Sequence, residues 1–353
     1  REAWLRARQA AEARAKPLGG MPPHAQPFPG DPQGPSAAQG SFQDARLNFL
    51  ALVLCLTMGT AALPHILTRF YTTPSVREAR HSVTWSLLFI AVLYVTAPAL
   101  AVLVKHEVLH HLVGSSFDTL PGWISAWSKV DPTLLSVSDV NRDGVLQLGE
   151  IRIGSDIIVL AMPVVISGLV AAGALAAALS TADGLLLTIA NALSHDLYYK
   201  VIDPRAPTYR RVMVSKVALL GVTLLAALVA AQRPADIVFL VSAAFSLAAG
   251  GLFPALVAGV FWKRANRWGA CGAMVVGFSV TLYYMATTHP WLRSLFGVGG
   301  SVADHLWFGI APIAAGLFGV VAGTATLVAL SLITPAPSRA AQALVDDIRS
   351  PEL

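Results

Sequence analysis

Two hydroxyls and a carboxylate interrupt an apolar stretch of the sequence. Ser180, Thr181 and Asp183 lie in AAALSTADGLL, within a run that is apolar enough to cross a membrane. One face of the expected helix carries small residues at spacings i, i+3, i+4 and i+7: Ala177, Ser180, Thr181 and Gly184. Small residues let a neighbouring backbone approach, and hydroxyl oxygens are hard ligands. We therefore interpret this face as half of a sodium site, which a facing helix must complete.

Other interpretations of this patch remain open from the residues alone. Ser180 and Thr181 are also compatible with hydroxyls that bond to the carbonyl four residues earlier and bind no ion. Asp183 is costly at membrane depth, which makes it a candidate coupling carboxylate. It is also compatible with a solvated position at the mouth of the membrane.

A second set of oxygen-bearing residues lies in DVNRDGVLQLGE, which runs from Asp139 to Glu150. The segment matches the twelve-place EF-hand loop in order, including Gly144 at the sharp turn of place 6. The ligands expected from this pattern are Asp139, Asn141, Asp143, the carbonyl of Val145, Gln147 through water, and bidentate Glu150. The segment predicts a structural calcium site. The alternative is a solvated acidic loop that caps the next helix.

The composition indicates that a membrane surrounds part of this chain. Hydrophobic residues make up 55% of its 353 residues and charged residues 13%, whereas soluble domains carry about 25% charged residues. Seven apolar blocks are each long enough for a helix that spans about 30 Å of hydrocarbon. They cover about residues 47–68, 83–104, 157–182, 212–231, 237–262, 268–287 and 307–333. We predict an all-α polytopic membrane protein whose partner is the lipid bilayer. The net charge of +5 lies in short clusters between blocks, so nucleic acid is not expected as a partner.

The blocks form a transmembrane domain, 47–335, between two flanking segments. Residues 1–46 are basic and rich in proline and glycine, which predicts an extramembrane linker, and residues 336–353 form a short tail. The positive-inside rule places the connections richest in Lys and Arg, and the tail with them, in the cytoplasm. The long segment 105–156, which contains the acidic residues 139–150, is then an external loop. Because the chain begins with Arg1 rather than Met, we expect a longer protein that continues upstream.

Two of the blocks contain helix-interrupting residues. Gly59 and Pro64 lie near the middle of the first block, and the fifth contains AAGGLFPAL with Gly250 and Pro254. Proline removes a backbone donor, and broken helices near the membrane midplane are typical of secondary transporters. The alternative for each site is a packing kink.

Three motifs resemble one family of transporters. AALSTADGLLLTIANALSHDLYY resembles the eighth core helix, with its cytoplasmic extension, of the sodium:solute symporter family, and is most similar to the acetate-type cation symporters. GTAALPHILTRFYTTPSVREARHSV resembles the broken helix of this family and the basic loop after it. GVFWKRANRWGACGAMVVG resembles its later Trp-Lys-Arg turn and glycine-rich helix. The motifs occur in the family's order, and the resemblance covers about residues 47–334.

The resemblance implies a fold of the leucine-transporter type, which consists of two inverted five-helix repeats and additional helices. The first five blocks correspond to the second repeat, and the last two blocks correspond to additional helices. The family's sodium site then takes the carbonyl of Ala177 and the hydroxyls of Ser180 and Thr181. Its other ligands come from the first core helix, so the missing N-terminal half of the same transporter is an expected partner.

The resemblance also assigns the solute pathway and the activity. Solute contacts on the broken helix fall on Leu56, Thr60 and Pro64. Relatives that transport amino acids or sugars often carry aromatic residues at the first two places, so Leu56 and Thr60 suggest a smaller solute, a short-chain monocarboxylate such as acetate. We expect sodium-coupled symport of this small-molecule solute by alternating access in a bacterial inner membrane. The alternatives are a proton-coupled carrier that uses Asp183 and a membrane sensor domain derived from a symporter. The sequence contains no nucleotide loop, nucleophile elbow or zinc spacing, so we do not expect an enzyme.

Overall fold

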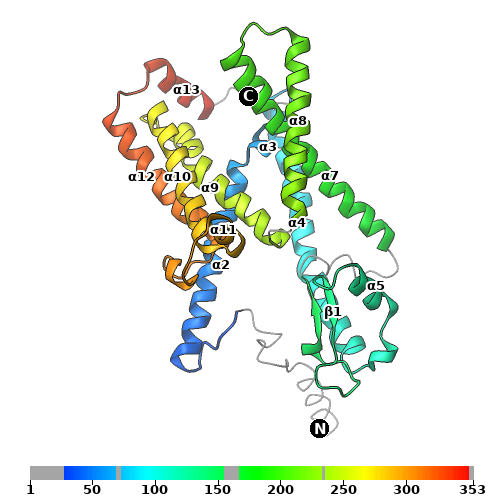
Figure 1. Ribbon diagram of the computed structural model, residues 1–353. Coiled ribbons are helices and arrows are strands. Elements are labelled where there is room, and N and C mark those ends of the chain that lie inside the picture. Colours follow the sequence, from blue (N-terminus) through cyan, green and yellow to red (C-terminus); the bar gives the residue numbers. More distant parts are fainter. Residues whose placement is uncertain (1–27, 69–72, 155–166, 233–234, 350–353) are drawn as a thin grey trace. The chain divides into compact units, whose positions relative to one another are not determined.

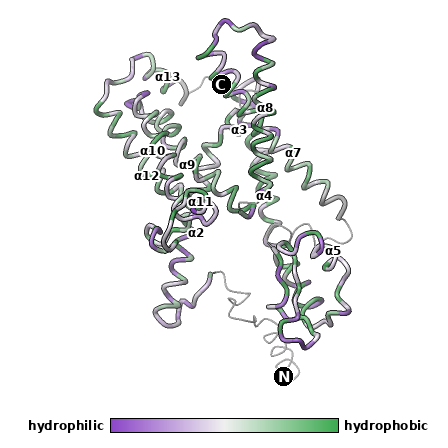
Figure 2. The backbone as a smooth tube through the Cα atoms, viewed as in Figure 1, coloured by the Kyte–Doolittle hydropathy of each residue, from purple (hydrophilic) through white to green (hydrophobic). Residues whose placement is uncertain are grey.

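The computed structural model describes residues 28–68, 73–154, 167–232 and 235–349, and Figure 1 shows their helices and strands along the chain. Within these residues, seven helices are long and apolar enough to cross a membrane. They are Ser36–Ala62, Val76–Leu112, Ala172–Ile202, Thr208–Ala231, Ile237–Phe261, Arg267–Thr288 and Pro312–Ile333. Figure 2 shows hydrophobic residues along these helices and hydrophilic residues in several of the connections between them. The predicted all-α polytopic class is therefore confirmed.

The described chain forms two compact units. Where the structure describes it, the first contains residues up to Phe42, which include the start of α2, and residues from His81 in α4 to Ala178 in α7. Its elements are α4 (Val76–Glu107), the π-helix η3 (Val108–Leu112), η4 (Phe117–Thr119), α5 (Gly122–Val130), β1 (Leu135–Val137), η5 (Leu148–Glu150) and β2 (Ile151–Ile153). The strands are antiparallel, with Leu135 opposite Ile153 and Val137 opposite Ile151.

The segment expected as an external loop, 105–156, is folded where the structure describes it. Residues 105–112 are helical, as the end of α4 and as η3, because Val104, Val108 and Leu112 follow each other at a spacing of four and bury one common face. This face packs in a core with α5, β1 and the residues around β2: Ile124, Leu135, Leu146, Leu148 and Ile151. We call this folded region, residues 104–154, the hairpin unit.

Helix α7 (Ser167–Asn191) continues as the π-helix η6 (Ala192–Ile202), and α8 (Thr208–Ala231) follows. The third apolar block, expected at 157–182, therefore ends too early, and its first part, 157–166, lies outside the described residues. The expected end lies directly before Asp183, whereas the helix continues through this residue to Ile202. As a result, Ser180 and Thr181 lie in the interior of a continuous helix.

The core of the second unit is a close-packed group of three helices: α9 (Ile237–Phe261), α10 (Arg267–Thr288) and α12 (Gly316–Ile333). Their contact is made by glycines, since a Cβ atom on Gly250, Gly277 or Gly319 would collide with the main chain or with Thr281. Thr281 Oγ1 donates to the carbonyl of Gly277 at 2.8 Å, so its hydroxyl is satisfied at this buried position. The shorter elements are α11 (Pro290–Phe296), η7 (Ala303–His305), η8 (Pro312–Ala314) and α13 (Arg339–Arg349).

The second expected helix interruption, at Pro254, is wrong, because α9 continues through this residue. Pro254 has no N–H, so the carbonyl of Gly250 four residues earlier loses its helical donor. The carbonyl of Gly250 instead faces Gly277 of α10 and lies near Gly323 of α12. Close contact between helices at glycines therefore accommodates the proline without a break.

Candidate transport site

The first helix, α2 (Ser36–Ala62), is broken where the sequence predicts an interruption. It begins before the expected boundary at 47, so the described end of the predicted linker is partly helical. Leu63 is extended, with φ −68° and ψ 119°, and Pro64 starts the short helix α3 (Pro64–Leu67). The last carbonyls of a helix have no intrahelical donors and carry a partial negative charge. The end of α2 is therefore suited to a cation or to a hydrogen-bond donor.

The end of α2 is held in place by one buried face. This face consists of Ala51, Cys55, Gly59 and Ala62. Gly59 lies against the main chain of Phe245 in α9, and Cys55 Sγ donates to the carbonyl of Ala314 at 3.3 Å. Because main chain and small residues make these contacts, the position of the break is determined by packing within this unit.

The three solute-pathway candidates lie on both sides of the break. Leu56 and Thr60 are four residues apart and share one stripe of α2, whereas Pro64 starts α3. Leu56 is half-buried, whereas Thr60 and Pro64 are exposed. Thr60 Oγ1 donates to the carbonyl of Leu56 at 2.7 Å, so the hydroxyl has a partner while its edge remains accessible. Their contact with a solute stays a prediction.

The sodium candidates lie on α7, where Ala177, Ser180 and Thr181 are exposed. Within the hydrophobic window of this span, no residue is buried. Thr188 on the same helix donates its hydroxyl to the carbonyl of Gly184 at 2.8 Å, which is the back-bond considered as the alternative for the other hydroxyls. The assignment of the sodium ligands stays a prediction, as does that of the exposed carboxylate of Asp183 as a coupling group.

Two polar residues that the sequence analysis did not select hold the segment before α12 in place. Asn48 of α2 donates its Nδ2 to the carbonyl of Gly309 at 2.9 Å, and its Oδ1 accepts from the N–H of Ala311. Ser246 of α9 donates its hydroxyl to the carbonyl of Ile313 at 3.0 Å. Both residues could have been found in the sequence, because each is a polar side chain within an apolar block. Such side chains mark positions where a helix contacts irregular main chain.

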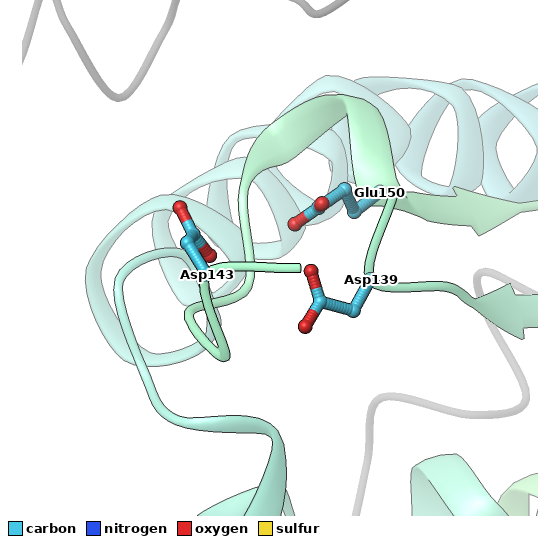
Figure 3. A group of neighbouring side chains, drawn as sticks. All are labelled: Asp139, Asp143 and Glu150. Carbon is cyan, nitrogen blue, oxygen red and sulfur yellow. The ribbon is translucent and has the colours of Figure 1, made fainter. Parts of the chain in front are cut away.

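The acidic segment brings together three of its six predicted ligands as a carboxylate cluster. Oxygens of Asp139, Asp143 and Glu150 lie within 4.8 Å of one another, and Figure 3 shows these side chains around a common space. The amides of Asn141 and Gln147 both donate to Asp143 Oδ2, at 2.9 and 2.8 Å. We call the segment from Asp139 to Glu150 the acidic ring.

Seven candidate spans, the first of which ends at the break at Leu63, define the class as a multi-pass membrane protein. Residues 151–277 match the sequence model of the sodium:solute symporter family. The chain is 52% identical over 321 residues to an uncharacterised symporter of Cupriavidus necator, which covers 89% of this chain and 46% of that protein. It is 31% identical over 233 residues to an uncharacterised symporter of Bacillus subtilis, covering 65% of this chain and 40% of that protein.

A third relative is named for a class of substrate. It is a monocarboxylic acid transporter of Corynebacterium glutamicum, which is 28% identical over 245 residues, covering 69% of this chain and 39% of that protein. No solved structure matches the chain. The chain belongs to the sodium:solute symporter family, and it spans less than half the length of the three relatives compared. The family and these three relatives are all named as symporters or transporters.

Proposed function

We propose that this chain is the C-terminal half of a sodium-coupled symporter for a small organic solute. The observation that carries the proposal is the helix break at Leu63, which packing holds in place in a chain of this family. Interrupted helices let secondary transporters offer main-chain groups to substrates and ions near the membrane midplane. A short-chain monocarboxylate such as acetate is the proposed solute, supported by the non-aromatic side chains of Leu56 and Thr60 and by the name of one relative.

The proposed mechanism is alternating access in a fold of the leucine-transporter type. Sodium binds to the carbonyl of Ala177 and the hydroxyls of Ser180 and Thr181, and the N-terminal half of the same transporter supplies the remaining ligands. The exposure of this face of α7 is compatible with such a partner. Sodium couples the two fluxes because its affinity differs between the outward-open and inward-open states. The setting is a bacterial inner membrane, with 47–335 as the membrane domain and the C-terminus in the cytoplasm.

Calcium, the other ion expected from the sequence, has no part in this transport cycle. Its role is structural and belongs to the acidic ring.

The test is uptake of radiolabelled acetate by proteoliposomes that contain the complete transporter with this chain. An inward sodium gradient should drive accumulation, and unlabelled propionate or pyruvate should compete if monocarboxylates are the solute class. Protein-free liposomes and collapse of the gradient with a sodium ionophore are the controls. Failure of a sodium gradient to drive uptake of any short monocarboxylate would contradict the proposal.

A proton-coupled carrier is the second candidate, because Asp183 places an exposed carboxylate within a candidate span. Uptake driven by a pH gradient in sodium-free buffer would favour this candidate. Asp183→Asn separates the two: sodium-driven uptake should persist under sodium coupling. Under proton coupling, the variant should lose concentrative uptake while it retains solute exchange.

A further inference from the structure

The acidic ring is the tip of a β-hairpin rather than a loop between two helices. It joins β1 to β2, and the N–H of Ser138 donates to the carbonyl of Glu150 at 3.0 Å across its neck. The backbone at place 6 turns sharply at Gly144, whose φ of +73° lies in the region that favours glycine. The hairpin therefore fixes both ends of the ring, as the flanking helices do in an EF-hand.

The carboxylates of the ring lack cationic partners within the described residues. Asp139, Asp143 and Glu150 make no ion pair there, although their oxygens lie within 4.8 Å of one another. Glu150 is 4% exposed, and its two oxygens accept main-chain N–H groups of Val140 and Gln147, at 2.8 and 2.9 Å. Three converging negative charges repel one another, and burial of one strengthens the repulsion.

One oxygen of this group points independently to a missing partner. Asp139 Oδ2 accepts the N–H of Gly144 at 3.0 Å, whereas Asp139 Oδ1 is shielded from solvent and accepts no hydrogen bond. A shielded acceptor without a donor is uncommon in folded proteins because its lost hydration is not replaced. Figure 3 shows the carboxylate of Asp139 beside those of Asp143 and Glu150, so a cation among them would satisfy this oxygen.

The donor set selects the kind of cation. All six places of the pattern offer oxygen: carboxylates, the amide oxygens of Asn141 and Gln147, and the carbonyl of Val145. The N–H of Val145 donates to Asp143 Oδ1 at 2.8 Å, which holds this carboxylate at its place in the ring. Oxygen-only sets of this size suit calcium, whereas structural zinc sites use sulfur and nitrogen.

The hairpin unit also supplies a substitute for the second loop with which an EF-hand normally pairs. The N–H of Leu146 donates to the carbonyl of Ser115, and the N–H of Gly114 donates to the carbonyl of Leu146, both at 2.8 Å. Ser116 and Val145 form an antiparallel bridge next to these bonds. Leu146, at place 8, is completely buried in the core of the unit. The segment 114–117, which follows η3 at the end of the α4 span, therefore braces places 6 to 8 of a single ring.

We propose that the acidic ring is a stand-alone calcium site, braced by segment 114–117, whose ion fastens the β-hairpin to the end of α4. The ligands are Asp139, Asn141, Asp143, Val145, Gln147 and Glu150. The bound ion removes the repulsion among the carboxylates and occupies the acceptor at Asp139 Oδ1. The ion is a structural component of the hairpin unit and is not transported.

The test uses the purified complete protein in detergent after removal of divalent ions with a chelator. Calcium chloride is titrated by calorimetry, and hydrogen exchange is followed for peptides that cover 114–117 and 139–150. We expect one saturable site with a dissociation constant of about 10⁻⁴–10⁻³ M, in the range of extracellular modules. Both peptides should gain protection together, since the ring and its brace are hydrogen-bonded. Magnesium chloride should bind more weakly, because it demands a smaller octahedral site.

Matched variants locate the ion. Asp139→Asn and Asp143→Asn should each weaken calcium binding by about tenfold or more, because each removes a charged ligand. Asp118→Asn, at an exposed carboxylate of the same unit outside the ring, should leave it unchanged. Asp143 is exposed, so its variant is expected to fold, and exchange protection of the core around Ile124 checks this.

Absence of saturable binding up to about 10 mM calcium, or equal binding by the ring variants and the control, would overturn the proposal. Protection of 139–150 without 114–117 would overturn the bracing role. None of these measurements involves transport, so they stand or fall independently of the proposed symport.

Discussion

Gly59 in α2 lies directly against the main-chain carbonyl of Phe245 in α9, where a Cβ atom would collide with backbone. Four residues further along the chain, α2 has ended and Leu63 is extended. The contact therefore fixes the position of the break in α2 relative to the three-helix core of α9, α10 and α12. Gly59 thus positions the candidate solute pathway through its contact with α9.

Replacement of Gly59 by Ala should separate α2 from α9 and destabilise the protein by about 1–3 kcal/mol, the usual cost of overpacking. The measurement is the thermal unfolding midpoint in detergent, together with the solute concentration for half-maximal uptake. Gly40→Ala is the matched control, since Gly40 lies in the same helix with open space around it. Alanine there should be neutral or stabilising by up to about 1 kcal/mol. Equal midpoints for the two variants would show that the close contact is unimportant.

Within the three-helix core, Gly277→Ala should have a larger effect than an alanine on the outer surface of the same helices. Its Cβ would collide with the carbonyl of Gly250 and press on that of Gly319, so both neighbouring helices must move. We expect a loss of about 1–3 kcal/mol, measured by thermal unfolding. Gly259→Ala in α9, where nothing lies near the added atom, is the control and should retain the wild-type midpoint.

Ser180→Ala and Thr181→Ala should each raise the sodium concentration for half-maximal uptake by about tenfold. This factor corresponds to the loss of about 1.4 kcal/mol, near the lower end for interactions with charged groups. Sodium titration of acetate uptake in proteoliposomes measures it. Thr188→Ala removes a hydroxyl of the same helix that bonds to the carbonyl of Gly184, and its sodium dependence should be normal. An unchanged sodium dependence in all three variants would refute the ligand assignment.

Asn266 joins the start of α10 to the end of α12, and the two ends of its side chain can be tested separately. Its Oδ1 caps α10 by accepting from Gly269 N at 2.9 Å, and its Nδ2 donates to Thr334 Oγ1 at 2.7 Å and to the carbonyl of Pro335 at 3.0 Å. Asn266→Ala should cost about 1–2 kcal/mol, because it removes the cap and the link to the tail. Asn266→Asp keeps the cap and should cost less. Thermal unfolding and proteolysis after residue 335 report the two effects, and the reverse order of stability would contradict this account.

The number of helices and their approximate places could be predicted from the sequence, because each span needs about 20 apolar residues. Their ends could not, as the extensions of α4 and α7 show. Lys105 and Asp196 lie in helical segments that continue beyond the apolar runs. Hydropathy reports the thickness of the hydrocarbon, whereas the helix continues for as long as its hydrogen bonds and packing allow.

The two prolines show a second limit of sequence reasoning. Pro64 breaks a helix and Pro254 does not, although both interrupt apolar blocks that also contain glycine. The difference lies in the neighbours: the carbonyl freed by Pro254 faces glycines of adjacent helices, which are distant in the sequence. The convergence of Asp139, Asp143 and Glu150 was predictable because the twelve-place pattern is local. The brace at 114–117 was not, because nothing in the pattern of the ring specifies it.

The span that begins at Val76 is longer than the hydrocarbon of a membrane is thick, and the hairpin unit lies at the end of this span. This span has 37 residues and is therefore about 55 Å long, against about 30 Å of hydrocarbon. Even a tilt of about 40° leaves about 42 Å along the membrane normal. The apolar run ends before Lys105, so 105–112 add up to about 12 Å of helix at the hairpin end, more than a Debye length of about 8 Å. We therefore expect the end of this helix to lie beyond the layer of ions that gathers at charged lipid headgroups. A cation bound by the hairpin unit would then exchange with the bulk solution rather than with this layer.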